Sequence, residues 1–215
     1  MKSVLVTGGT VRLGKAIAER LRAEGWRVIT SSHRADAGAD IVADLAEPMG
    51  PARLYAAALQ LLGGTPPDAL VNNAALFTGD AAAIGAVNLE APKKLTMLMA
   101  GRETGMGAVV NILDTKALDA SRHLPMSIDA YLASKRELAA FTLSSAATFA
   151  ATLRVNGVAP GPVLAPTEVH VKAGETLLDR RPTADDVAAA VSYLLGAEAT
   201  TGAIIPVDAG QHLLR

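Results

Sequence analysis

Two side chains that could handle a proton lie four residues apart in the segment Tyr131-Leu132-Ala133-Ser134-Lys135. Because residues four apart share one face of a helix, the Lys135 ammonium is expected beside the Tyr131 phenol. An unperturbed phenol has a pKa of about 10, and a neighbouring cation lowers it. This pair is therefore a candidate general acid for substrate protonation. Taken alone, an exposed helix surface is the alternative interpretation.

A glycine-rich segment follows the first strand-like run and reads Thr7-Gly8-Gly9-Thr10-Val11-Arg12-Leu13-Gly14. Glycines at such a turn allow the backbone to approach a pyrophosphate that lies on the amino end of the next helix. The candidate cofactor-binding residues here are Gly8, Thr10, Arg12, Leu13 and Gly14. An ordinary strand-to-helix turn is the alternative.

Two more polar or Pro-Gly segments come directly after strand-like runs. Asn72-Asn73-Ala74 follows one of them, and Pro160-Gly161 follows another. Ligands of parallel sheets bind outside the carboxyl ends of the strands, so these five residues are further cofactor-binding candidates. The asparagines could instead cap a turn.

The end of the second strand bears on the choice of cofactor. NAD-specific dinucleotide-binding proteins place a carboxylate at the end of this strand, where it binds the ribose 2′-hydroxyl. Here the strand runs into Ser32-His33-Arg34, with no acid until Asp36. Arg34 and Arg12 could flank a 2′-phosphate, and Ser32 or His33 could donate further hydrogen bonds. The sequence therefore predicts NADP(H) rather than NAD(H).

The elements that must position these residues alternate along the chain. The patterns predict strands over residues 3–6, 26–30, 40–43, 69–71, 108–113, 154–158 and 203–207. They predict helices over residues 13–24, 51–62, about 89–100, 131–150 and 184–195. Such alternation indicates an α/β fold with right-handed crossovers. We expect one doubly wound, Rossmann-type domain over residues 1–215, with a parallel sheet of about seven strands and helices on both faces.

Composition limits the partners. The 215 residues carry a formal net charge of −1, half of them are hydrophobic, and there is no cysteine. A near-neutral chain has no global field to attract nucleic acid, and no stretch approaches the roughly 20 apolar residues of a membrane helix. The four histidines show no ligand spacing, so no metal site is predicted. We expect a cytoplasmic protein that binds a small-molecule substrate, without nucleic-acid or membrane partners.

In order and spacing, these motifs resemble the short-chain dehydrogenase/reductase family over nearly the whole chain, including residues 201–210 as its last strand. The resemblance implies a nicotinamide-dependent enzyme, usually a homotetramer, in which Tyr131 is the general acid and Lys135 also bonds the nicotinamide ribose. Asn88 matches the family asparagine that positions a relay water, and a helix-start residue is its alternative. Asp44 and Leu45 match residues near the adenine, although Asp44 might equally cap a turn.

Three residues resemble one subgroup, the pteridine and dihydromonapterin reductases. Asp114 stands where the family usually has a catalytic serine, and Arg12 replaces the middle glycine of the turn. Phe77 matches the phenylalanine that stacks on the pterin, and a small hydrophobic plug is its alternative. The resemblance implies an NADPH-dependent reductase of a dihydropterin or dihydrofolate, with Asp114 among the catalytic residues.

The chain departs from that subgroup in three places. Ala75 replaces a frequent serine, the interval from Asp114 to Tyr131 is long, and the segment 160–181, where relatives carry a substrate-covering helix, is short. The residues 115–130 or a neighbouring subunit could cover the site instead. Two alternative functions follow: a generic carbonyl or 3-oxoacyl reductase, and a catalytically weak NADP-binding regulatory protein.

Overall fold

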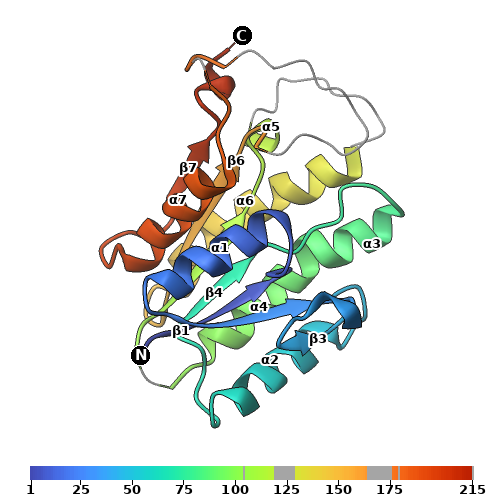
Figure 1. Cartoon of the computed structure of the whole chain (residues 1–215), viewed down its shortest axis with the longest axis vertical. Coiled ribbons are helices and arrows are strands. Elements are labelled where there is room, and N and C mark those ends of the chain that lie inside the picture. The colour runs from blue at the N-terminus through green and yellow to red at the C-terminus, as the bar shows by residue number, and fades with distance from the viewer. Residues whose placement is uncertain (104, 119–128, 164–175, 179, 215) are drawn as a thin grey trace.

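Strands and helices alternate along the chain in the computed structural model, which describes residues 1–103, 105–118, 129–163, 176–178 and 180–214 (Figure 1). The strands are β1 (Ser3–Thr7), β2 (Arg27–Ser32), β3 (Ile41–Val42), β4 (Ala69–Asn72), β5 (Gly107–Ile112), β6 (Leu153–Pro160) and β7 (Ile204–Val207). The α-helices are α1 (Arg12–Ala23), α2 (Gly50–Leu61), α3 (Ala81–Gly85), α4 (Ala91–Ala100), α5 (Thr115–Leu118), α6 (Asp129–Thr148) and α7 (Ala184–Gly196). Shorter turns are the 3-10 helices η1 (Ala35–Ala37) and η4 (Gln211–Leu213) and the π-helical turn η2 (Ala86–Glu90).

The part of the chain that the structure describes forms one seven-stranded sheet in the order β3-β2-β1-β4-β5-β6-β7. Every neighbouring pair of strands is parallel. The chain moves outward from β1 in one direction to β3, and then from β4 in the other direction to β7. The carboxyl ends of β1 and β4 therefore meet at the switch point where ligands bind in such sheets.

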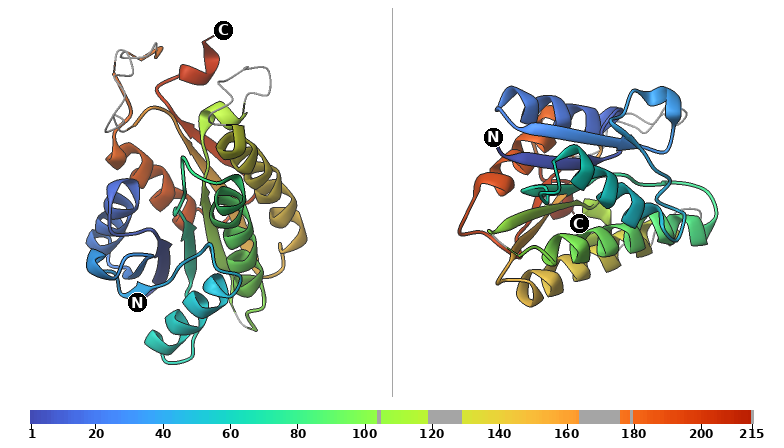
Figure 2. Two further views of the ribbon diagram at one scale, coloured as in Figure 1. Left: turned by 90° about the vertical axis from the view of Figure 1, so that its right-hand side faces the viewer. Right: turned by 90° about the horizontal axis from the view of Figure 1, so that it is seen from below.

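Two layers of helices cover the sheet, as the views in Figure 2 show. Side chains alternate between the two faces of a strand, so Val4 and Val6 of β1 pack with α1 and α7, and Leu5 packs with α2 and α4. Both layers are built mainly from aliphatic side chains, and the two buried clusters enclose the central strands. The predicted doubly wound α/β fold is confirmed.

Helix ends follow local chemistry. In α7, Thr183 and Asp186 form a capping box, in which the Thr183 hydroxyl accepts from the Asp186 amide and the Asp186 carboxylate accepts from the Thr183 amide. After α1, Gly25 has a positive φ of 86°, a conformation that costs glycine little. The longest described helix, α6, carries Tyr131 and Lys135.

The predicted boundaries differ from the observed ones in one instructive place. The helix expected from about residue 89 begins at Ala81, because Asp80 caps it by accepting from the Ala83 amide. It then passes through η2 into α4. Asn88 therefore lies inside a continuous helical segment, and its interpretation as a helix-start residue is wrong. The range 115–130 was expected to be a loop, but its described ends are helical, since residues 115–118 form α5 and residues 129–130 belong to α6. Residues 119–128 and much of the short segment 160–181 lie outside the described residues.

The described helices include none that is both long enough and apolar enough to cross a lipid bilayer.

Candidate active site

The glycine-rich turn between β1 and α1 is tightly closed. A Cβ on Gly14 would lie 2.0 Å from the Gly8 carbonyl oxygen, and one on Gly9 would lie 2.7 Å from the Thr30 methyl group. Gly8 has a φ of 61°, and Arg12 has a φ of 50°, which is unusual for a residue with a side chain. Arg12 thus adopts a left-handed backbone conformation, which glycine favours. The turn offers bare backbone at the amino end of α1, as a pyrophosphate requires.

Residues after β4 hold this turn in place. The Thr7 hydroxyl accepts hydrogen bonds from the backbone amides of Asn73 and Ala74 at 2.9 and 3.0 Å. The Asn73 side chain donates to the carbonyl oxygens of Thr7 and Gly8 at 2.9 and 3.1 Å. Asn73 and Ala74 therefore shape the cofactor turn from the neighbouring strand. Thr7 was not among the predicted cofactor-binding residues, yet its hydroxyl accepts both of the amide hydrogen bonds that link β1 to the segment after β4.

Asn72 lies apart from that group. Its side chain is buried, and its amide donates to the Asn111 side-chain oxygen at 2.8 Å; Asn111 in turn donates to the Thr142 hydroxyl at 2.9 Å. This polar chain joins β4, β5 and α6 inside the protein. The structure thus places the Asn72 side chain away from the cofactor turn, in contrast to its neighbour Asn73.

Asp114 and Tyr131 meet at the carboxyl end of β5. The Tyr131 hydroxyl donates to Asp114 Oδ2 at 3.0 Å, and the backbone amide of Lys116 donates to Asp114 Oδ1 at 2.8 Å. The carboxylate is therefore fixed at both oxygens, one by its own turn and one by the phenol. A serine at this position would offer one uncharged hydroxyl oxygen in place of the two carboxylate oxygens.

Lys135 is buried one turn further along α6, with 2% of its surface exposed. Its Nζ donates to the Ile112 carbonyl oxygen at 2.7 Å and lies 5.9 Å from the centre of the Tyr131 ring. The ammonium is thus near the phenol ring and anchored to the end of β5. The spacing of four residues brings the two side chains together as expected.

Burial dominates the proton affinities of this group. It raises the pKa of Asp114, although the Lys116 amide, the Tyr131 hydroxyl and two lysine charges oppose it. Burial and the Asp114 charge raise the pKa of Tyr131 well above its usual value. Burial also lowers the pKa of Lys135 to about 8, against the opposing attraction of Asp114. The sequence predicted that Lys135 would lower the pKa of the phenol, whereas burial and Asp114 raise it in this structure.

Phe77 faces the same phenol. Its ring centre lies 4.9 Å from that of Tyr131 at an interplanar angle of 63°, an edge-to-face contact, and 56% of the residue is exposed. An exposed ring is not a plug beneath a loop, so the alternative interpretation of Phe77 is wrong. The segment that carries Phe77 is held by Asn88, whose side chain pairs with both backbone polar atoms of Leu76 at 2.7 and 2.8 Å.

The Asn88 amide also donates to the Ser134 hydroxyl at 3.2 Å, and that hydroxyl donates to the Tyr131 carbonyl oxygen at 2.6 Å. Asn88 therefore links the Phe77 segment to the helix of the phenol. Its side chain positions two parts of the site. Ser134 was not predicted from the sequence, since a serine inside the Tyr-to-Lys interval gives no signal of its own.

At the end of β2, the Ser32 hydroxyl accepts from the backbone amide of Arg34 at 3.1 Å. The Arg34 guanidinium donates to both carboxylate oxygens of Asp36, from Nε at 3.0 Å and from Nη2 at 2.7 Å. His33 and Arg34 are exposed beside this turn. A cavity of about 170 Å³ lies close by, lined by the turn residues Gly9 and Thr10 and others.

The remaining predicted cofactor residues are spread along the carboxyl edge. Asp44 accepts from the backbone amide of Ala46 at 2.8 Å and so caps a turn, while Leu45 is buried in the core. Leu13 packs against the core from the start of α1. The Pro160 carbonyl accepts from the Thr115 hydroxyl at 3.3 Å.

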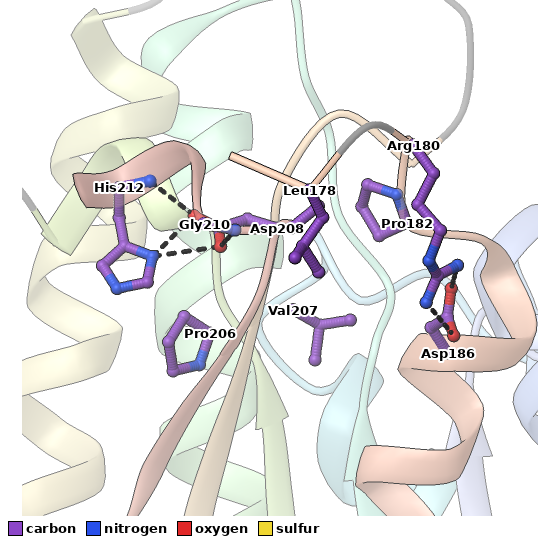
Figure 3. A pocket seen from close by; sticks show the side chains of 10 residues that line it. Leu178, Arg180, Pro182, Asp186, Pro206, Val207, Asp208, Gly210 and His212 are labelled. Atoms are coloured by element: carbon purple, nitrogen blue, oxygen red, sulfur yellow. Dashed lines mark hydrogen bonds and ion pairs between the residues drawn. The ribbon is translucent and has the colours of Figure 1, made fainter. Parts of the chain in front are cut away.

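Gly161 packs against Asp208, since a Cβ there would lie 2.5 Å from the Asp208 Cβ. Asp208 is buried and accepts hydrogen bonds from the amides of Gly210 and His212 and from His212 Nδ1 (Figure 3). It borders a cavity of about 300 Å³ at the end of β7. These contacts fix η4. That turn packs against α5, the short helix that begins directly after Asp114.

Comparison with known proteins agrees with this geometry. The family model for short chain dehydrogenase matches residues 2–176. A putative ketoacyl reductase 2 of the granaticin polyketide synthase from Streptomyces violaceoruber is 33% identical over 98% of this chain and 96% of its own length. Pteridine reductase 1 from Leishmania tarentolae is 28% identical over 98% of this chain and 96% of its own.

A solved structure extends the comparison to three dimensions. FolM alternative dihydrofolate reductase 1 from Brucella canis, complexed with NADP, is 31% identical and matches with a TM-score of 0.86. The match covers 100% of this chain and 95% of the other. Family model, relatives and fold agree: this chain belongs to the short-chain dehydrogenase family of oxidoreductases.

Proposed function

We propose that this protein is an NADPH-dependent reductase of a pterin-like substrate, a dihydropterin or dihydrofolate. The proposal rests on the hydrogen bond between the Tyr131 hydroxyl and Asp114 Oδ2, 3.0 Å long, and on the exposed Phe77 ring that contacts Tyr131. Pteridine reductase 1 and the FolM alternative dihydrofolate reductase 1 among its relatives support it.

The glycine-rich turn fits the cofactor. Gly8 and Gly14 have no side chains, so a pyrophosphate can approach their backbone at the amino end of α1. Arg12 and Arg34 supply cations for a 2′-phosphate. When bound, the reduced nicotinamide supplies a hydride. Comparison structures complexed with NADP support this choice of cofactor.

Reducing a ring imine requires a proton at nitrogen as well as a hydride at carbon. The raised pKa of Tyr131 keeps its phenol protonated at neutral pH, so the hydroxyl is a proton donor. Asp114, with a raised pKa of its own, can take a proton from solvent and return it to the phenol oxygen. Lys135 adds positive charge close to the phenol, which stabilises the anion that forms as the proton leaves.

Phe77 gives a flat heteroaromatic substrate a platform. More than half of the residue is exposed, and its edge-to-face contact with Tyr131 sets it beside the proton donor. Aromatic stacking contributes about 0.5–1.5 kcal/mol beyond area burial. A small ketone has no ring system to use this surface.

A carbonyl or 3-oxoacyl reductase is the second candidate, and the ketoacyl reductase relative from Streptomyces violaceoruber favours it. Asp114 opposes it, because ketone reduction in this geometry needs a neutral hydroxyl to hold the carbonyl oxygen. A third candidate function is that of a catalytically weak, cofactor-binding regulatory protein. The contacts that Tyr131 makes with Asp114 and Lys135 argue against it, because they assemble a proton-transfer group.

The substitution Asp114→Ser separates the two enzymatic candidates. We expect the variant to lose at least about tenfold in kcat/KM for dihydropterin, a barrier change of about 1.4 kcal/mol, and to keep or gain activity on simple ketones. Kinetics of both proteins on both substrate classes make the test. Equal losses on both classes, or no loss on dihydropterin, would contradict the role of Asp114.

A further inference from the structure

Asp36 already binds the Arg34 guanidinium, which is predicted to contact the 2′-phosphate of NADPH. The Arg34 side chain donates from Nε and Nη2 to the two oxygens of Asp36, a two-bond geometry in which arginine also frequently binds phosphate. Both side chains are exposed to solvent. Arg34 therefore meets any incoming anion with one edge of its guanidinium already engaged.

The loop that presents Asp36 is fixed at its base. The Asp40 carboxylate accepts from both the amide and the hydroxyl of Thr30 at 2.7 Å, and the Ala43 amide donates to the Ser32 carbonyl oxygen at 2.9 Å. Between these anchors, η1 holds Asp36 in its first turn. Asp36 thus stays beside the end of β2, where the cofactor ribose is expected.

We propose that Asp36 is a specificity-determining residue that competes with the 2′-phosphate for Arg34 and so limits the preference of this enzyme for NADPH over NADH. The inference rests on the cofactor part of the proposed function. A guanidinium has five N–H donors, and Asp36 engages two of its three nitrogens. The phosphate must displace the carboxylate or bind beside it.

Charge makes both routes costly. A 2′-phosphate carries about −1.5 to −2 charges at neutral pH, whereas the 2′-hydroxyl of NADH carries none. The Asp36 charge repels the former and leaves the latter nearly unaffected. The hydrogen bond and charge of Arg34 lower the pKa of Asp36, so the carboxylate is ionised throughout the physiological range.

The experiment isolates the 2′-phosphate with two small probes, adenosine 2′,5′-bisphosphate and 5′-AMP, titrated calorimetrically into the full chain. Asp36→Asn keeps the size of the side chain and removes its charge. We expect the bisphosphate to bind about three- to tenfold more tightly to this variant, and 5′-AMP to change by less than about twofold. The gain should shrink at high salt, because both side chains are exposed.

Two controls define the mechanism. Asp185→Asn removes an exposed charge at the start of α7 and should leave both titrations unchanged. In an Arg34→Ala background, Asp36→Asn should lose most of its gain, because the two residues act as a pair.

Unchanged or weaker bisphosphate binding in Asp36→Asn would overturn the inference, and so would an equal gain in Asp185→Asn. If Arg34→Ala itself leaves bisphosphate binding unchanged, the proposed Arg34 contact also fails. If Arg34→Ala weakens bisphosphate binding but Asp36→Asn leaves it unchanged, the Arg34 contact stands and only the competition by Asp36 is overturned.

Discussion

The proposed catalytic side chains differ in how firmly each holds its proton. Tyr131, the proposed proton donor, makes an edge-to-face contact with the exposed ring of Phe77, and Asp114 accepts its hydrogen bond. Replacing Tyr131 by phenylalanine removes only the hydroxyl. We expect this variant to lose about 10²–10⁴-fold in turnover with dihydropterin while NADPH binding stays within about twofold. Steady-state kinetics and a cofactor titration measure both, and more than about a tenth of the wild-type rate would refute the general-acid role.

The pH profile reports the coupling between Asp114 and Lys135. Because burial lowers the pKa of Lys135 to about 8, its charge is lost as the pH rises through that value, and kcat/KM for reduction should fall there. Asp114 raises the pKa of Lys135, so Asp114→Asn should move the descending limb to lower pH. Initial rates across the pH range for both proteins provide the measurement. A limb that stays in place would show that Lys135 does not control it.

The sequence predicts which residues lie at the site better than it predicts their surroundings. The spacing of Tyr131 and Lys135 gave their proximity, and the position of Asp114 after a strand gave its place at the site. Proton affinities could not be predicted, since they depend on burial, which the spacing does not encode. The Arg34–Asp36 pair was missed for a similar reason: the residues were known, but the local turn that joins them was not.

At the scale of elements, hydrogen bonds between the ends of β1 and β4 position the glycine-rich turn, the proposed cofactor site. Gly14→Ala places a methyl group 2.0 Å from the Gly8 carbonyl oxygen, where only backbone could yield. We expect a loss of about 1–3 kcal/mol in the free energy of unfolding and at least about tenfold weaker NADPH binding. Denaturant unfolding and a binding titration measure the two effects.

Gly85→Ala is the matched control. Gly85 lies in α3, and a Cβ there meets nothing within 4 Å. Alanine should therefore stabilise the helix by up to about 1 kcal/mol and leave cofactor binding unchanged. Similar losses in both variants would show that the close approach at Gly14 is not what matters.

Element order was predictable because strand and helix periodicities differ strongly in this chain. The start of α3 was not, since Ala81-Ala82-Ala83 has no apolar periodicity and only the Asp80 cap marks its beginning. The π-helical turn that contains Asn88 was equally hidden. The side chain of Asn88 in this turn bonds with Leu76 and Ser134, and contacts between residues distant in sequence leave no local pattern.

At the scale of the whole molecule, we predict a homotetramer with α4 and α6 at its interfaces. Met97 and Leu98 on α4 and Leu143 on α6 are exposed apolar side chains. Leu143→Glu should shift the molar mass in light scattering at micromolar concentration to a smaller species, because a buried charge at an interface is costly. Leu61→Glu, at an exposed position near the end of α2, should leave the molar mass unchanged. A monomeric wild-type chain would contradict the prediction.

We propose that this site reduces a pterin-like ring, rather than a simple ketone, with NADPH. The most direct measurement is NADPH oxidation by the purified protein against dihydropterins, dihydrofolate and simple ketones. We predict a kcat/KM for at least one dihydropterin or dihydrofolate that exceeds that for every ketone by at least about tenfold. Comparable or greater kcat/KM for the ketones would contradict the claim.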